Sequence, residues 1–220
     1  MTTTIRNLST LLMLCFTSFA AAGLVINEID ADTTGTDVLE FVELMGDPNM
    51  PLDGFSIVGV NGSDDMTYDT FAFDLDGFSL DADGFFVIGN PGAPGVDLAT
   101  PNANNAVQNG ADAIVLFMGD IANFPNDTAP PTGAVVVDVI HYGTNDSADA
   151  GIAALYPSAV YVDEGTLGDK DTDSIGRIPN GMNGTFQTLD TPTPSDLNVV
   201  PEPGTFALLL MGGLFLFRRR

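Results

Sequence analysis

The stretch LVINEID, residues 24–30, has the pattern that decides the fold class. Its residues alternate, so that Val25, Asn27 and Ile29 would share one face of an extended strand. Short runs of the same kind follow, separated by turns rich in Gly, Asp and Asn: residues 38–46, 55–60, 66–78, 84–90, 113–119 and 134–143. Many short strands with little helical periodicity predict an all-β sandwich.

The segments between these runs predict one helix and two long loops. Residues 147–156 (SADAGIAALY) are the helical candidate, of one or two turns. Residues 91–112 and 119–133 are rich in Pro, Gly and Asn, and we expect both to be loops. Long loops at the end of a sandwich are where binding residues usually lie.

Residues 1–22 have the features of a secretory signal peptide. Arg6 is their only charge, an apolar run covers residues 11–19, and Ala20 to Ala22 supply a small-residue cleavage site. We therefore expect a signal-peptide helix that is removed after Ala22, with a buried N-terminal helix as the alternative. Because Cys15 is the one cysteine of the sequence, the mature protein would have no disulfide and no thiolate metal site.

The region between the two ends is strongly acidic. From Gly23 to Val200 there are 29 acidic residues against two basic ones, Lys170 and Arg177, a formal net charge of −27. Nucleic acid is excluded as a partner, since phosphate binding needs Lys and Arg. An anionic polysaccharide would be repelled unless a divalent cation bridges the two. Such a charge suits a salty or calcium-containing medium.

The C-terminus, residues 200–220, joins a short motif, an apolar run and a basic cluster. The motif and the cluster consist of Val200, Pro201, Glu202, Pro203, Arg218, Arg219 and Arg220. Residues 204–217 between them are uncharged. The fifteen residues from 203 to 217 would span about 22 Å as a helix, less than the roughly 30 Å of a hydrocarbon core. The arginines would remain on the cytoplasmic side.

This arrangement resembles the PEP-CTERM sorting signal of Gram-negative bacteria. The resemblance implies an inner-membrane intermediate with a short transmembrane helix at residues 204–217. It implies two partners, the secretion translocon and an exosortase-type membrane enzyme that cuts near Pro201–Pro203. The product would be delivered to the cell surface or the extracellular matrix. A permanent single-pass anchor is the alternative reading of the same tail.

The central region resembles the lamin-tail domain, an immunoglobulin-like β-sandwich. The residues that carry this resemblance are Asn27-Glu28, Glu40 to Leu44, Leu52 to Ile57, Gly84 to Ile88, Asp173 to Arg177, and Pro192-Thr193-Pro194. Ser195 stands where the family usually has Gly, and Phe41 and Phe55 where Trp is common. The resemblance implies a binding or structural domain over residues 23–187, followed by a Pro/Thr linker over 188–199.

Candidate catalytic residues are few. His141 is the only histidine, and a catalytic triad or a histidine zinc site needs partners that the chain lacks. Glu40 and Glu43 are a tempting carboxylate pair beside Glu28, but three residues apart on a strand they point to opposite faces. We therefore expect Glu43 to be structural and Glu40 to be solvated.

Calcium is the one cofactor that the sequence suggests. Asp169, Asp171 and Asp173 have the opening spacing of an EF-hand loop, although Ser174 and Asn180 replace its Gly and Glu. Other pairs with this spacing are Asp30/Asp32, Asp74/Asp76 and Asp81/Asp83. The alternative is that all of them are turn residues on an acid-rich surface.

These observations predict an exported protein whose sandwich has no enzymatic activity. Its work would be binding or structural, with exopolysaccharide or surface proteins as partners. Two alternatives remain open. One is a secreted metal-dependent hydrolase with an acidic metal site in the loops of residues 91–133, and the other is a permanently membrane-anchored surface protein.

Overall fold

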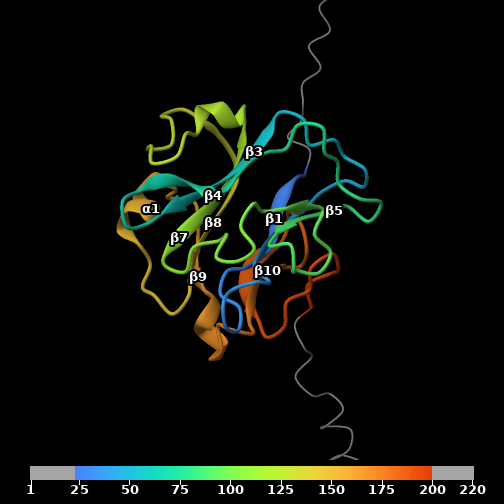
Figure 1. The fold of residues 1–220 in the computed structure, drawn as a ribbon, viewed down its shortest axis with the longest axis vertical. Helices are drawn as coiled ribbons and strands as arrows, with labels where there is room; N and C mark the ends of the chain where they lie inside the picture. The colour runs from blue at the N-terminus through green and yellow to red at the C-terminus, as the bar shows by residue number, and fades with distance from the viewer. Residues whose placement is uncertain (1–22, 200–220) are drawn as a thin grey trace, which may run out of the picture.

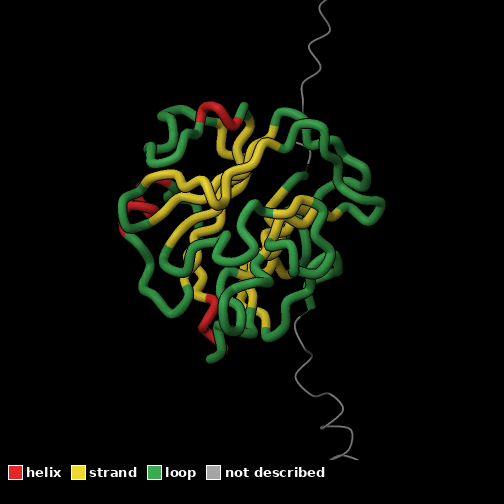
Figure 2. The backbone as a smooth tube through the Cα atoms, viewed as in Figure 1, coloured by secondary structure: helices red, strands yellow, loops and turns green. Residues whose placement is uncertain are grey.

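The computed structural model describes residues 23–199. The expected signal peptide and the expected sorting tail lie outside this range. The described residues form eleven strands and three short helices, and most of the remaining chain is loop (Figures 1 and 2). The strands make two sheets, one of six strands and one of five.

The six-stranded sheet has the order β11-β10-β1-β2-β5-β6, and its pairs are antiparallel except for β5 with β6. Its strands are β1 (Val25–Asp30), β2 (Phe41–Met45), β5 (Phe85–Gly89), β6 (Leu98–Ala99), β10 (Ser174–Ile178) and β11 (Thr185–Leu189).

The five-stranded sheet has the order β4-β3-β7-β8-β9, and its pairs are antiparallel except for β8 with β9. Its strands are β3 (Phe55–Asn61), β4 (Met66–Asp74), β7 (Asp112–Met118), β8 (Val135–Gly143) and β9 (Tyr161–Asp163).

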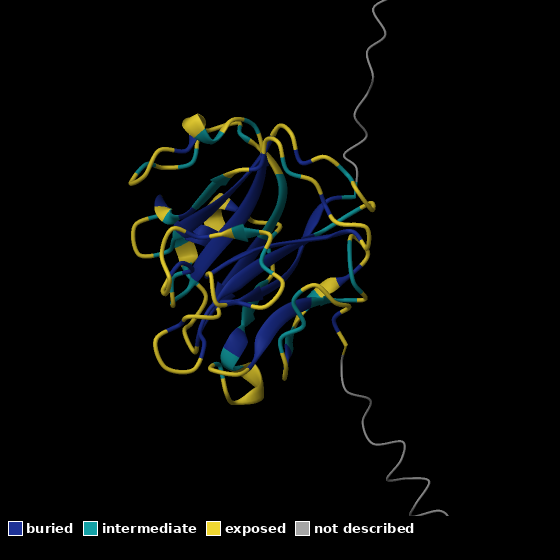
Figure 3. Cartoon of the chain, turned by 45° about the vertical axis from the view of Figure 1, so that its right-hand side comes forward, coloured by how far each residue is buried: buried dark blue, intermediate teal, exposed yellow. Residues whose placement is uncertain are grey.

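The two sheets pack face to face over a shared apolar core. Ile29 and Leu44 enter it from the six-stranded sheet, and Leu116, Ile140 and Tyr142 from the five-stranded one. In Figure 3 the buried strands fill the centre and the exposed segments are mainly loops around them. The prediction of an all-β sandwich is therefore confirmed, and all seven predicted strand runs contain a strand.

The outer face of the five-stranded sheet is also covered. The short helices α1 (Ala150–Leu155) and η1 (Ile121–Asn123) lie over it, and the ring of Phe124 stacks on that of Phe117 with centroids 4.2 Å apart. Burial on both faces explains why residues 113–119 read as one continuous apolar run. The predicted helix is confirmed as α1, which begins after Asp149 caps the N–H groups of Gly151 and Ile152.

Strand β1 departs from the predicted alternation. The register between β1 and β2 shifts between Ile26 and Glu28, so Asn27 is the extra residue of a β-bulge. Ile26 and Ile29 consequently both join the core, although strict alternation places them on opposite faces. The bulge leaves Asn27 and Glu28 on the outer face.

Arg177 joins the two sheets near β1. From β10 its Nη2 donates to both carboxylate oxygens of Asp138 on β8, at 2.8 Å each. Its Nε donates to the main-chain oxygen of Ile26 at 2.7 Å, and its guanidinium lies 4.0 Å from the ring centroid of Phe186. One of the two basic residues of the acidic region is thus a structural link.

No helix within residues 23–199 is long and apolar enough to cross a membrane. The segment expected to do so, residues 204–217, lies outside the described part of the chain.

Candidate functional site

The sorting residues are not among those described. Val200, Pro201, Glu202, Pro203 and the cluster from Arg218 to Arg220 all follow residue 199. Their role stays a prediction from the sequence.

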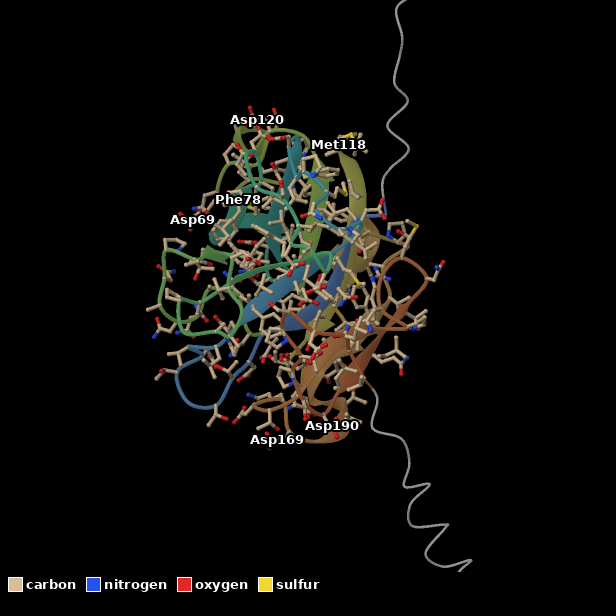
Figure 4. The ribbon with its side chains drawn as sticks, turned by 90° about the vertical axis from the view of Figure 1, so that its right-hand side faces the viewer. Asp69, Phe78, Met118, Asp120, Asp169 and Asp190 are labelled. Atoms are coloured by element: carbon tan, nitrogen blue, oxygen red, sulfur yellow. The ribbon has the colours of Figure 1, made fainter. Side chains whose placement is uncertain are left out.

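The structure does not bring Asp169, Asp171 and Asp173 together as a calcium site. Asp171 pairs with Lys170 at 2.8 Å, and Asp173 donates its N–H to the main-chain oxygen of Asp169 at 3.0 Å, as in a turn. Across residues 23–199, no three Asp, Glu, His or Cys side chains form a group that could hold a metal. Figure 4 shows Asp169 at the lower end of the domain, near Asp190. Calcium binding at this spacing remains a prediction.

Two acidic residues of the long loops are acceptors for main-chain N–H groups. Asp97 accepts a hydrogen bond from the N–H of Val87 at 2.9 Å, and Asp120 caps η1 through the N–H of Ala122 at 2.8 Å. Asp120 lies at the upper end of the domain in Figure 4, away from Asp169. These positions give no support to a metal-dependent active site in residues 91–133.

His141 has a structural position at the end of β8. It is almost fully buried, its Nε2 accepts the N–H of Asp149 at 3.2 Å, and its ring meets that of Tyr161 edge-on. Burial lowers the pKa of the imidazole, which keeps it neutral as an acceptor. His141 therefore positions the residue that caps α1.

Glu28 and Glu43 face each other across β1 and β2 on the outer face of the six-stranded sheet. Glu28 accepts hydrogen bonds from the hydroxyl of Ser174 at 2.6 Å and from the N–H and hydroxyl of Thr193 at 2.9 and 2.8 Å. Glu43 accepts from the side-chain amide of Asn27 at 2.9 Å and from the N–H of Ser195 at 2.6 Å. Both carboxylates thus hold the chain that follows β11.

That chain, residues 190–199, is called the C-terminal segment below. Asn198 fixes its far end, since its side-chain amide donates to the main-chain oxygen of Asn27 at 3.0 Å. Gly176 makes room for it, because a Cβ there would lie 2.6 Å from the Asn198 amide nitrogen. The expected linker over 188–199 is corrected: Thr188 and Leu189 belong to β11, and the C-terminal segment is docked on the sheet.

Glu40 also departs from its expected place. It was expected to be solvated, yet it is fully buried, and its Oε2 accepts the N–H groups of Ala106 at 2.6 Å and Val107 at 3.3 Å. Its Oε1 has no hydrogen-bond donor. Burial raises its pKa to about 8. Loop 91–111 folds back over the start of β2 and takes this side chain out of water.

Glu40 is part of a larger group of carboxylates where β1 ends. This β1-end acid cluster consists of Asp30, Asp32, Asp37, Glu40 and Glu164, all of them buried. Glu164 begins η2 (Glu164–Leu167) and accepts the N–H of Ala31 through Oε1 at 2.9 Å. Burial, with mutual repulsion, raises the pKa of Asp30 and of Glu164 well above the ordinary values.

The cluster has little positive charge to balance it. Lys170 pairs with Asp32, and the lysine is itself partly exposed. Asp37 accepts the N–H of Thr33 at 2.9 Å and the side-chain amide of Asn109 at 3.2 Å. Oxygens of Asp30, Glu40 and Glu164 and the hydroxyl of Thr33 are buried without a partner among the described residues.

A groove of about 470 Å³ runs beside β8. β9 pairs only with His141 to Gly143, so residues 135–139 of β8 have no strand beside them on that side within the described chain. Val136, Val160 and Phe186 line the groove, and Val160 is exposed. An open strand edge of this kind offers unpaired main-chain groups to an extended chain.

The fold and these sites define an all-β sandwich with buried structural carboxylates. Comparison with known proteins adds no family to this description, since no family model, curated protein or solved structure matches the chain.

Proposed function

We propose that this chain is an exported protein of the cell surface or extracellular matrix of a Gram-negative bacterium. Its sandwich, of the immunoglobulin-like lamin-tail type, is a non-catalytic binding or structural domain. The tail is a PEP-CTERM sorting signal with a transmembrane helix at 204–217, which is processed after export. The lamin-tail and PEP-CTERM assignments are inferred from resemblances in the sequence, and three features of the chain support them.

The observation that carries the proposal is where the folded chain starts and ends. Leu24 is already in the core, at 2% exposed, and Asn198 is still buried on the sheet, at 4%. The sandwich thus fills the stretch between the expected signal peptide, residues 1–22, and the motif that begins at Val200. Both signals can be removed without taking a strand from either sheet.

The use of the titratable residues supports a non-catalytic role. Glu28 and Glu43 hold the C-terminal segment, and His141 accepts a main-chain N–H. A catalytic carboxylate or imidazole must reach a substrate, whereas these groups are committed to the fold. The open edge of β8 is consistent with a binding role.

The partners follow from the proposed route and the charge. The translocon and an exosortase-type enzyme would handle the two ends. At the surface, a domain with a net charge of −27 would approach an anionic exopolysaccharide through bridging divalent cations, or would contact surface proteins.

The test is the mass of the mature protein, isolated separately from membranes, matrix and medium of the native organism. We expect a chain that starts near Gly23 and ends near Pro201 to Gly204, found outside the membrane fraction. A Pro201→Ala/Pro203→Ala double variant should accumulate in the membrane, whereas Pro131→Ala in an exposed loop should be processed normally. An intact Arg220 in the membrane fraction alone would contradict processing and favour the permanent anchor.

The non-catalytic part has its own test. The purified protein is assayed on nucleic acid, phosphoester and glycan substrates with calcium, magnesium or zinc present. We expect no turnover. Metal-dependent hydrolysis that is lost in Asp97→Asn or Asp120→Asn, in the loops of residues 91–133, would establish the hydrolase alternative instead.

A further inference from the structure

The β1-end acid cluster is an unusual place to bury charge. A carboxylate taken out of water must be compensated by hydrogen bonds, by a cation or by a proton. Here Asp30, Asp32, Asp37, Glu40 and Glu164 lie at one end of the sandwich, and Lys170 pairs only with Asp32 among them. Among the described residues, Lys170 pairs with Asp32, and the other four carboxyl groups must be hydrogen-bonded, protonated or bound to a cation.

Two carboxylate oxygens of the cluster, on Asp30 and Glu164, leave room for a ligand because they are buried without a hydrogen-bond donor. Oδ1 of Asp30 and Oε2 of Glu164 are buried and accept no hydrogen bond from the described residues. The two side chains are almost fully buried, at 5% and 0% exposed. The other oxygen of Glu164 is held at 2.9 Å by the N–H of Ala31, the residue after Asp30. The charge of Asp30 is also among the causes that raise the pKa of Glu164, so the two carboxyl groups are neighbours.

We propose that this end of the sandwich binds one calcium ion, with Asp30 and Glu164 as its carboxylate ligands. Calcium accepts six to eight oxygen ligands in flexible geometry, including main-chain carbonyls, hydroxyls and water. Two carboxylates therefore suffice as the charged part of the site, although no three form a ready-made group within residues 23–199. The unpartnered hydroxyl of Thr33 is a further oxygen in the same loop.

The donor types select calcium among common metals. The cluster offers only oxygen, whereas zinc favours nitrogen and sulfur, and magnesium demands a rigid octahedral shell at shorter distances. His141 is committed to Asp149 through its Nε2, and the one cysteine lies in the expected signal peptide.

The ion would join the two sheets. Asp30 ends β1 of the six-stranded sheet, and Glu164 begins η2 directly after β9 of the five-stranded sheet. A cation between them neutralises the cluster and closes this end of the sandwich. The stability of the domain then depends on calcium in the surrounding medium, independently of how its tail is processed.

The experiment is thermal unfolding of the purified full-length protein at pH 7.5, in EDTA and in 5 mM calcium at equal ionic strength. We expect calcium to raise the unfolding temperature by about 5 °C or more, and magnesium to do much less. Isothermal titration with calcium should give one site per chain.

Variants locate the site. Asp30→Asn and Glu164→Gln should each lower the calcium affinity at least tenfold and lose most of the thermal shift. In EDTA each should be as stable as the unsubstituted protein or more so, because it removes an uncompensated charge. The control Asp69→Asn, an exposed residue, and the double variant Asp169→Asn/Asp171→Asn should keep the shift.

Three results would overturn the inference: no binding heat at millimolar calcium, a thermal shift that sodium chloride reproduces, or a shift retained in Asp30→Asn and Glu164→Gln. Loss of the shift in the Asp169→Asn/Asp171→Asn variant alone would move the site to that turn. If either cluster variant fails to fold even in EDTA, its carboxylate is a structural acceptor, which also contradicts the proposal.

Discussion

Strand β1 contributes to two groups of buried acids, the pair Glu28 and Glu43 and the β1-end acid cluster that contains Asp30. The two groups differ in how their carboxyl groups are compensated. Glu28, paired with Glu43, accepts hydrogen bonds from three donors on Ser174 and Thr193. Asp30 is two residues further on, and its Oδ1 accepts none from the described chain. The first pair is satisfied by protein donors and the second group is not. A carboxylate's surroundings, more than its burial, thus decide whether it is a structural acceptor or a ligand for something outside the chain.

The source of the donors explains the difference. The C-terminal segment returns to the sheet and offers the N–H groups of Thr193 and Ser195 to Glu28 and Glu43. At the end of β1, the neighbouring loops offer mainly further acids, Asp37 and Glu164 among them. The following changes test this contrast, in order of expected effect.

The largest effect should come from Arg177→Ala. This change removes the side chain that joins β10 to Asp138 on β8 and to the main-chain oxygen of Ile26 on β1. It leaves Asp138, whose side chain is 14% exposed, without its cation. We expect a loss of about 4 kcal/mol in the free energy of unfolding, measured by urea denaturation. Loss of less than about 1 kcal/mol would show that the two sheets are held together without this link.

Glu28→Ala removes the carboxylate whose two oxygens are both hydrogen-bonded by protein donors. It leaves the donors of Ser174 and Thr193 without their acceptor, so we expect a loss of about 3 kcal/mol. The loss should be the same in EDTA and in calcium, and protease should release the C-terminal segment faster. Asp69→Ala, at an exposed position, should change stability by less than about 0.5 kcal/mol.

The pH dependence of the free energy of unfolding tests the protonation of Glu43, the partner of Glu28 across β1 and β2. Burial, with the charges of Glu28 and Asp81, raises the pKa of Glu43 to about 8 from an ordinary value of 4.5. The folded state therefore keeps this proton to a higher pH than the unfolded state, and stability falls as pH rises from about 4.5 to about 8. We expect a fall of at least about 1 kcal/mol, measured by urea denaturation in EDTA.

Glu43→Gln should have a flatter pH profile than the unsubstituted protein over the same range. The comparison uses the slope, because the amide also changes one hydrogen bond to Asn27 or Ser195. An unchanged slope would mean that Glu43 is ionised in the folded state at pH 5.

Much of the fold could be predicted from the sequence, because buried strands leave continuous apolar runs such as residues 113–119. Three features could not. The bulge at Asn27 changes which residues of β1 face the core, and the sequence around Asn27 gives no sign of it. Glu40 reads as a solvated acid until loop 91–111 covers it. The C-terminal segment reads as a linker because its Pro and Thr residues have no strand pattern, yet Glu28 and Glu43 bind it.

The site was harder to predict for a related reason. The spacing of Asp30 and Asp32 singled them out, as did the pattern at Asp169, Asp171 and Asp173. Nothing in the sequence around Glu164 marks it as a ligand, since only the packing of the two sheets brings it to the end of β1, where it accepts the N–H of Ala31. Sequence spacing detects ligands within one loop, and it misses those that two elements contribute.

The smallest effect should come from Lys170→Ala, beside the β1-end acid cluster. The lysine is partly exposed and pairs with Asp32 and Asp171, so its loss should cost less than about 1 kcal/mol in EDTA. Because it removes a positive charge beside the acid cluster, it should raise calcium affinity a few-fold in an isothermal titration. A weaker affinity would indicate that Lys170 holds Asp32 in place for the ion.

The contrast between the two groups is tested most directly by a crystal structure of the protein with terbium in place of calcium. We expect one anomalous peak within ligand distance of Asp30 and Glu164, and none beside Glu28 and Glu43. A structure in which Asp30 and Glu164 carry no ion, or in which the peak lies at Asp169 to Asp173, would show that the uncompensated oxygens at the end of β1 are not a cation site.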